Sequence, residues 1–122
     1  MALHPEKQPL LILIGGASHT YSLAARSDNA VYWVDCGGMM GDPFTGITIK
    51  HGYFSVEHYG GSGWRWTRII TFKYSAAEKS WFLYKDGHES FHASDPETVK
   101  EKVYTVENFG KVPFARFDIY KE

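Results

Sequence analysis

Alternating apolar and polar residues predict a long β-strand in the centre of the chain, from Trp64 to Tyr74. Residues two apart in a strand share a face, and this segment separates cleanly into two faces. The apolar face contains Trp64, Trp66, Ile70, Phe72 and Tyr74, whereas the polar face contains Arg65, Thr67, Thr71 and Lys73.

Arg68 is the exception, because strict alternation places it on the apolar face. A buried guanidinium needs a carboxylate or an aromatic ring as a partner. The sequence offers Glu57 and Glu89 as carboxylates, while a bulge near Thr67 would instead turn Arg68 outward. Both alternatives stay open at this point.

A hairpin precedes this strand. Residues 47–50 and 53–59 flank His51-Gly52, a two-residue turn in which glycine suits the positive φ that such turns require. The turn fixes a register with two apolar pairs on one buried face, Ile49 with Phe54 and Ile47 with Val56.

A second hairpin follows the strand and completes a meander. Gly60–Gly63 breaks the chain before the strand, and residues 75–80 turn it into residues 81–85. This pairing again matches apolar faces, with Tyr74 opposite Trp81 and Phe72 opposite Leu83.

The N-terminal segments predict shorter elements. The aliphatic run Leu10–Ile14 is typical of a fully buried strand, residues 20–26 predict a second strand, and residues 31–34 predict a short third one. The stretch 36–43 contains too many turn-forming residues for regular structure and predicts a long loop.

The C-terminal third predicts helical turns and a last strand. Asp95-Pro96-Glu97 has the order of an N-cap, a first-turn proline and a first-turn acid, so a short helix is expected through Val103. Thr105 is placed to cap a single turn that Gly110 closes. Residues 112–120 alternate imperfectly, as expected of an edge strand that contains proline.

These elements predict one mainly β domain over residues 1–122. We expect an antiparallel meander sheet of about six or seven strands with one or two short helices, sandwich- or barrel-like. Aromatic residues make up 16% of the chain, which agrees with strands because rings fit a pleated surface.

Charge and hydropathy exclude some functions. The formal net charge is −1 and there is no basic block to neutralise phosphates, so nucleic-acid binding is not expected. The longest aliphatic run, Leu10–Ile14, is far shorter than the roughly 20 residues that span a bilayer. No signal peptide is recognisable at the start of this chain.

The segment His88-Glu89-Ser90-Phe91-His92 matches the H-E-x-x-H pattern of zinc proteases. That chemistry needs a helix, which brings both imidazoles to one face. Asp86-Gly87 before the segment and Asp95-Pro96 after it leave no room for one, so His88 and His92 are weak metal candidates only. In a strand, both would share a face and Glu89 would point away.

Other candidates for chemistry are weaker still. Cys36, the only cysteine, has no base nearby in the sequence to activate it as a nucleophile. Asp35 and Asp42 are too few to indicate a calcium site. We therefore predict no metal and no cofactor.

An aromatic and basic group around the Gly60–Gly63 loop is the strongest candidate for ligand binding. Rigid amphipathic rings can stack on a sugar or anchor a protein partner, although aromatic residues in strands more often pack in the core. The candidate residues are Trp64, Tyr59, His58 and Arg65.

Several motifs together resemble the C-terminal portion of a family of uncharacterised bacterial exported proteins. They are Gly41-Asp42-Pro43-Phe44-Thr45-Gly46-Ile47, Phe54-Ser55-Val56-Glu57-His58-Tyr59-Gly60-Gly61-Ser62, Trp64-Arg65-Trp66, Glu89-Ser90-Phe91-His92 and Phe109-Gly110-Lys111-Val112. The resemblance implies a periplasmic or extracellular location and a longer N-terminus in related proteins. It implies no catalytic or binding residues.

The sequence favours a non-enzymatic binding or interaction domain with an unknown protein or carbohydrate ligand. No acid, base and nucleophile converge in it. The alternatives are a metal-dependent or Cys/His hydrolase and a purely structural C-terminal domain of a longer protein.

Overall fold

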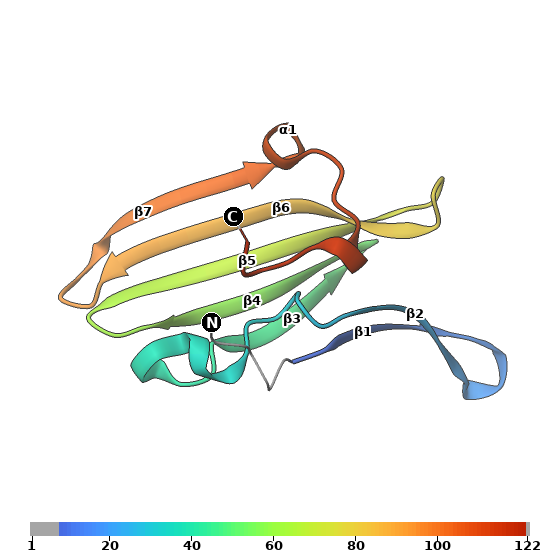
Figure 1. The fold of residues 1–122 in the computed structure, drawn as a ribbon, viewed down its shortest axis with the longest axis horizontal. Helices are drawn as coiled ribbons and strands as arrows, with labels where there is room; N and C mark the ends of the chain where they lie inside the picture. Colours follow the sequence, from blue (N-terminus) through green and yellow to red (C-terminus); the bar gives the residue numbers. More distant parts are fainter. Residues whose placement is uncertain (1–7, 122) are drawn as a thin grey trace.

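A five-stranded antiparallel sheet dominates the computed structural model, which describes residues 8–121 (Figure 1). Its strands follow one another in chain order, so the sheet is the predicted meander. The strands are β3 (Phe44–Lys50), β4 (Tyr53–Gly61), β5 (Trp64–Ser75), β6 (Ser80–His92) and β7 (Asp95–Thr105). Together with a separate hairpin they make seven strands in two antiparallel sheets, which confirms the expected mainly β fold.

The separate hairpin is formed by β1 (Leu10–Gly15) and β2 (Tyr21–Ser27), joined through the 3-10 turn η1 (Ala17–His19). Figure 1 shows its closed end extending past the larger sheet. The prediction that Leu10–Ile14 is fully buried was wrong, because only the root of the hairpin packs against the core. Leu10, Ile12 and Ala25 make that contact.

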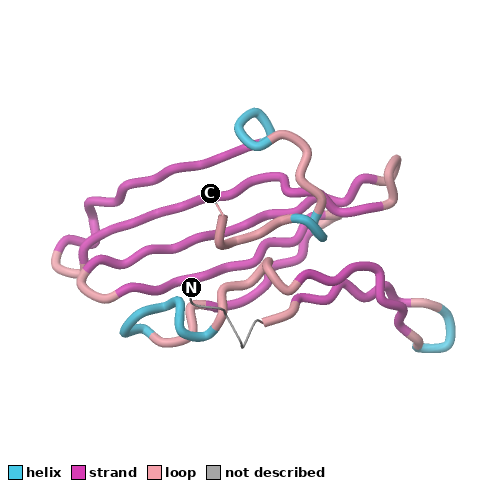
Figure 2. Tube along the Cα trace, viewed as in Figure 1, coloured by secondary structure: helices cyan, strands magenta, loops and turns pink. Residues whose placement is uncertain are grey.

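The core lies on one face of the five-stranded sheet, here called the inner face. Fully buried side chains of β4 and β5 meet Phe114 and Ile119 from the C-terminal segment. Phe54 stacks on Phe72 with 5.1 Å between ring centroids, and Phe114 contacts both rings edge-on. Figure 2 shows loop rather than strand covering this face, because the C-terminal segment contains only the 3-10 turn η3 (Phe114–Arg116).

The predicted registers of both hairpins are confirmed. Ile49 pairs with Phe54 across His51-Gly52, and both turn residues have positive φ. However, Ile49 is 80% exposed although Phe54 is buried. β3 is the edge strand of the sheet, so the covering segments do not reach its outermost residues. The second hairpin pairs Tyr74 with Trp81 and Phe72 with Leu83 as expected.

Three predicted elements differ in the structure. Residues 31–34 are not a strand but lead into the kinked 3-10 segment η2 (Val34–Met40), which occupies most of the expected loop. Residues 95–103 form β7 rather than a helix, because pairing with β6 along its length outweighs the local cap signal. Residues 112–120 are not a strand and make one isolated bridge, between Pro113 and Phe82.

The single helical turn was predicted correctly. It is α1 (Val106–Phe109), and the Asn108 side chain accepts a hydrogen bond from the Thr105 amide at 2.9 Å. Gly110 closes it with a φ of 70°. Within the part of the chain described, no helix is long and apolar enough to cross a membrane.

Candidate functional site

Arg68 lies on the inner face and forms a buried ion pair with Asp86. Its Nε donates to Oδ1 at 3.0 Å and its Nη2 to Oδ2 at 2.7 Å, which is the bidentate geometry favoured between arginine and carboxylate. The two side chains are only 8% and 10% exposed. The alternation that placed Arg68 inward therefore holds, and the proposed partners Glu57 and Glu89 were wrong.

A β-bulge in β6 explains why the sequence pattern did not identify Asp86 as the partner of Arg68. Phe72 pairs with Leu83 and Thr71 with Lys85, so Tyr84 is an extra residue in β6. The insertion brings Leu83 and Asp86, three residues apart, onto the same face, where strict alternation would separate them. The detectable signal was an unmatched arginine on β5 together with an aspartate in the neighbouring strand.

The remaining donors of Arg68 fasten two loop segments to the sheet. Nη1 donates to the Tyr32 hydroxyl at 2.7 Å and to the Ile119 carbonyl at 2.8 Å. Burial acts to lower the pKa of Arg68, but the hydrogen bonds and charge of Asp86 prevail and raise it. The guanidinium therefore stays charged and ties the Tyr32 loop and the C-terminal segment to β5.

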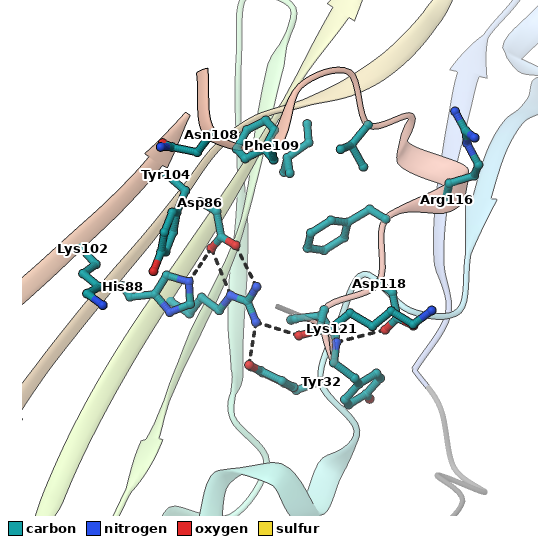
Figure 3. A pocket seen from close by; sticks show the side chains of 16 residues that line it. Tyr32, Asp86, His88, Lys102, Tyr104, Asn108, Phe109, Arg116, Asp118 and Lys121 are labelled. Carbon is teal, nitrogen blue, oxygen red and sulfur yellow. Dashed lines mark hydrogen bonds and ion pairs between the residues drawn. The ribbon is translucent and has the colours of Figure 1, made fainter. Parts of the chain in front are cut away.

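His88 extends this cluster towards solvent. Its Nε2 lies 3.1 Å from Asp86 Oδ1, and its side chain is 39% exposed. Its ring meets Tyr104 of β7 edge-on, with 5.7 Å between centroids. Figure 3 shows the Asp86 carboxylate joined to His88 by a dashed line. The same carboxylate accepts from the Arg68 guanidinium, which also donates to the Tyr32 hydroxyl.

A cleft of about 1020 Å³ opens above this cluster. Lys102 and Tyr104 of β7 stand on one side and the C-terminal segment on the other, with Asn108 and Phe109 between them (Figure 3). The lining residues are Tyr32, Arg68, Leu83, Asp86, His88, Lys102, Tyr104, Asn108, Phe109, Val112, Arg116, Phe117, Asp118, Ile119, Tyr120 and Lys121.

Positive charge exceeds negative charge around this cleft. Because Arg68 and Asp86 neutralise each other, the other formal charges in the lining are Lys102, Arg116 and Lys121 against Asp118. Phe109, Val112 and Phe117 supply apolar surface, so the cleft combines apolar walls with basic side chains.

The four residues predicted to bind a ligand do not form one surface. Trp64 is 61% exposed on the inner face, where its ring meets His92 edge-on at 5.1 Å. Tyr59 and Arg65 lie on the opposite, outer face, and Arg65 Nη1 donates to the Tyr59 hydroxyl at 3.2 Å. Trp64 remains accessible to a ligand, but it is separated from this pair by the sheet.

His58 is buried within the core rather than placed at the surface. It is 2% exposed, and its Nε2 accepts a hydrogen bond from the Tyr32 amide at 3.2 Å. No partner for Nδ1 occurs among the described residues. Burial is the main cause that lowers the pKa of His58 to about 4, so the ring is neutral and structural at neutral pH.

The H-E-x-x-H segment lies in β6 and is extended, as the flanking residues predicted. His88 and His92 share the inner face, but an extended strand separates their Cα atoms by about 13 Å. The Cys36 thiol is half-buried, and burial is the main cause that raises its pKa. Among residues 8–121, no three His, Cys, Asp or Glu side chains group as metal ligands would.

Comparisons with protein-family models, curated proteins and solved structures find no match for this chain. The resemblance to bacterial exported proteins therefore stays a prediction.

Proposed function

We propose that this chain is a non-enzymatic binding domain of a bacterial exported protein, and that the cleft above Arg68 and Asp86 holds its ligand. The observation that supports this most is the combination of one large cleft with apolar walls and an excess of basic side chains. Small-molecule sites are typically concave and mostly apolar, with a few polar groups that orient the ligand.

The side chains best suited to acid–base or nucleophilic chemistry are held in ion pairs, buried or kept in an unreactive protonation state. Asp86 is buried between Arg68 and His88, which hold both of its oxygens. His58 is neutral and enclosed, and the raised pKa of Cys36 favours the unreactive thiol. A hydrolase would need a nucleophile or activated water beside His88, so binding is the better supported function.

The lining favours a compact organic anion with an apolar body. Lys102 and Lys121 approach the cleft from opposite sides, and either ammonium group can pair with a carboxylate or a phosphate. Phe109 and Phe117 offer the apolar contact. The inner face continues along β5 to Trp64, four residues before Arg68, so a longer ligand would also cover that ring.

A matched pair of probes tests this proposal: naphthalene-2-carboxylate and its neutral carboxamide, titrated into labelled protein and followed by NMR. We expect the carboxylate to shift amides of β6, β7, α1 and residues 112–121 in a saturable way, and the carboxamide to bind more weakly. Saturable shifts confined to the outer face or to the β1–β2 hairpin would contradict the cleft. Equal binding of both probes would contradict the anionic ligand.

A further inference from the structure

The β1–β2 hairpin exposes an unusual amount of apolar surface. Five large side chains, here called the hairpin patch, are each between 47% and 73% exposed: Leu11, Leu13, Ile14, Tyr21 and Leu23. Leu13 pairs with Leu23 and Gly15 with Tyr21, so both strands contribute to one face, whereas Ile14 pairs with Ser22 on the other face. Contiguous exposed apolar surface of this kind marks an interaction site more often than a free surface.

The hairpin also lacks the support that two strands usually need. A two-stranded hairpin is marginally stable in water, and only the root of this one packs on the core. Each strand has one edge without a strand partner in the part of the chain described. Its exposed end therefore leaves both backbone edges and apolar side chains in contact with water.

The free edge of β1 has neither the proline nor the charged side chains that protect the edge of β7, and the one irregularity of the hairpin is an extra residue in β2, Ala24. Soluble proteins guard edge strands with charged side chains, proline or bulges. The exposed edge strand β7 contains Pro96 and the charged run Lys100-Glu101-Lys102. By contrast, the five residues Leu10–Ile14 of β1 are all leucine or isoleucine.

We propose that β1 pairs with β1 of a second copy of this chain, antiparallel about a twofold axis, to give a four-stranded sheet in the order β2–β1–β1–β2. A twofold interface must be self-complementary, since each residue faces the same surface on its partner. β1 meets this condition because it contains no ionisable side chain, and neither does the hairpin patch apart from the Tyr21 phenol. A second copy therefore buries no unpaired charge, and its leucine and isoleucine side chains match those of the first.

Chemistry favours a second copy over an unrelated partner. Transient partners recognise surfaces about as polar as the rest of a protein, whereas homodimer interfaces are more apolar. Arg26 is the only charged residue of the hairpin strands, and it already pairs with Asp28 at 3.0 Å near the root. The pairing would also extend the marginal two-stranded sheet to four strands.

Sedimentation velocity from about 1 µM to about 500 µM tests the proposal. The wild-type chain should change from monomer to dimer with concentration, and Leu13→Lys should weaken dimerisation at least about tenfold. Ile49→Lys is the matched control, because it makes the same kind of change at an exposed aliphatic residue of another edge strand. It should dimerise as the wild type does.

Hydrogen exchange distinguishes edge pairing from other contacts. Amides of β1 should exchange more slowly at high concentration, whereas those of β7 should not change. If Leu13→Lys fails to fold, Leu23→Lys on β2 replaces it as the patch variant. A chain that stays monomeric at the highest concentration, assembles beyond dimers, or loses dimerisation equally in Ile49→Lys would overturn the proposal.

Discussion

Replacing Asp86 with alanine should destabilise the fold more than any surface change, because it leaves a buried guanidinium without its carboxylate. Arg68 would lose both Asp86 hydrogen bonds, at 3.0 and 2.7 Å, in a site where its side chain is 8% exposed. Removing one partner of a buried ion pair costs about 3–5 kcal/mol. That is a large share of the about 5–15 kcal/mol that stabilises a typical domain.

Urea unfolding followed by tryptophan fluorescence measures this loss. For a domain of this size the expected cost corresponds to a melting temperature lower by about 10–20 °C. The C-terminal segment should loosen as well, because the same guanidinium donates to the Ile119 carbonyl and the Tyr32 hydroxyl. Faster hydrogen exchange of residues 117–120 at low urea would report that loosening.

Two further variants test whether the loss of stability comes from the burial of the ion pair or from ion pairing alone. Glu78→Gln breaks the exposed ion pair between Lys111 and Glu78, and it should cost under about 1 kcal/mol. The double variant Arg68→Met with Asp86→Leu removes both charges and should recover most of the lost stability. If Asp86→Ala costs no more than Glu78→Gln, the proposed anchoring role of the buried pair is refuted.

Three other predictions concern the core, the exposed tryptophan and pH. Phe54→Ala should cost about 3–5 kcal/mol in urea unfolding, since Phe54 packs among buried rings, and a loss under about 1 kcal/mol would contradict that packing. Trp64→Ala should change stability by less than about 1.5 kcal/mol because its ring is mostly exposed, so unfolding of this variant at room temperature would place Trp64 in the core. The pKa of His58 is lowered to about 4, so its contribution to stability is complete above pH 6.5 and is lost as the pH falls towards 4, by about 3 kcal/mol in total. His58→Gln should lack this part of the pH dependence, and an unchanged pH profile would show that His58 is not the group responsible.

The alternation of apolar and polar residues correctly predicted how strands that follow one another in the sequence pair. The registers around His51-Gly52 and between Tyr74 and Trp81 followed from matching apolar faces, and the structure has both. Alternation failed at Asp86, because one inserted residue in β6 reverses every face beyond it. For residues 95–103 the helix prediction relied on a local cap signal, which pairing with the preceding strand β6 outweighed.

The cleft could not be predicted from the sequence, for a different reason. Its walls come from β6, β7, α1 and an irregular C-terminal segment, which no periodic pattern places together. The aliphatic run in β1 led to a wrong prediction of burial for a related reason. Hydrophobicity indicates that a segment tends to be buried, but it does not indicate whether the same chain or another molecule covers it. Its exposure in the single chain is what points to a second copy.

The most direct test of the proposed cleft is the ratio of affinities for naphthalene-2-carboxylate and its neutral carboxamide, measured by calorimetry in three proteins. The wild type should prefer the carboxylate, and Lys102→Glu should abolish or reverse that preference because it places a negative charge at the cleft. Lys85→Glu makes the same charge change on the opposite face of β6 and should keep the wild-type ratio. A ratio unchanged by Lys102→Glu, or lowered equally by Lys85→Glu, would contradict the assignment of this cleft as the binding site.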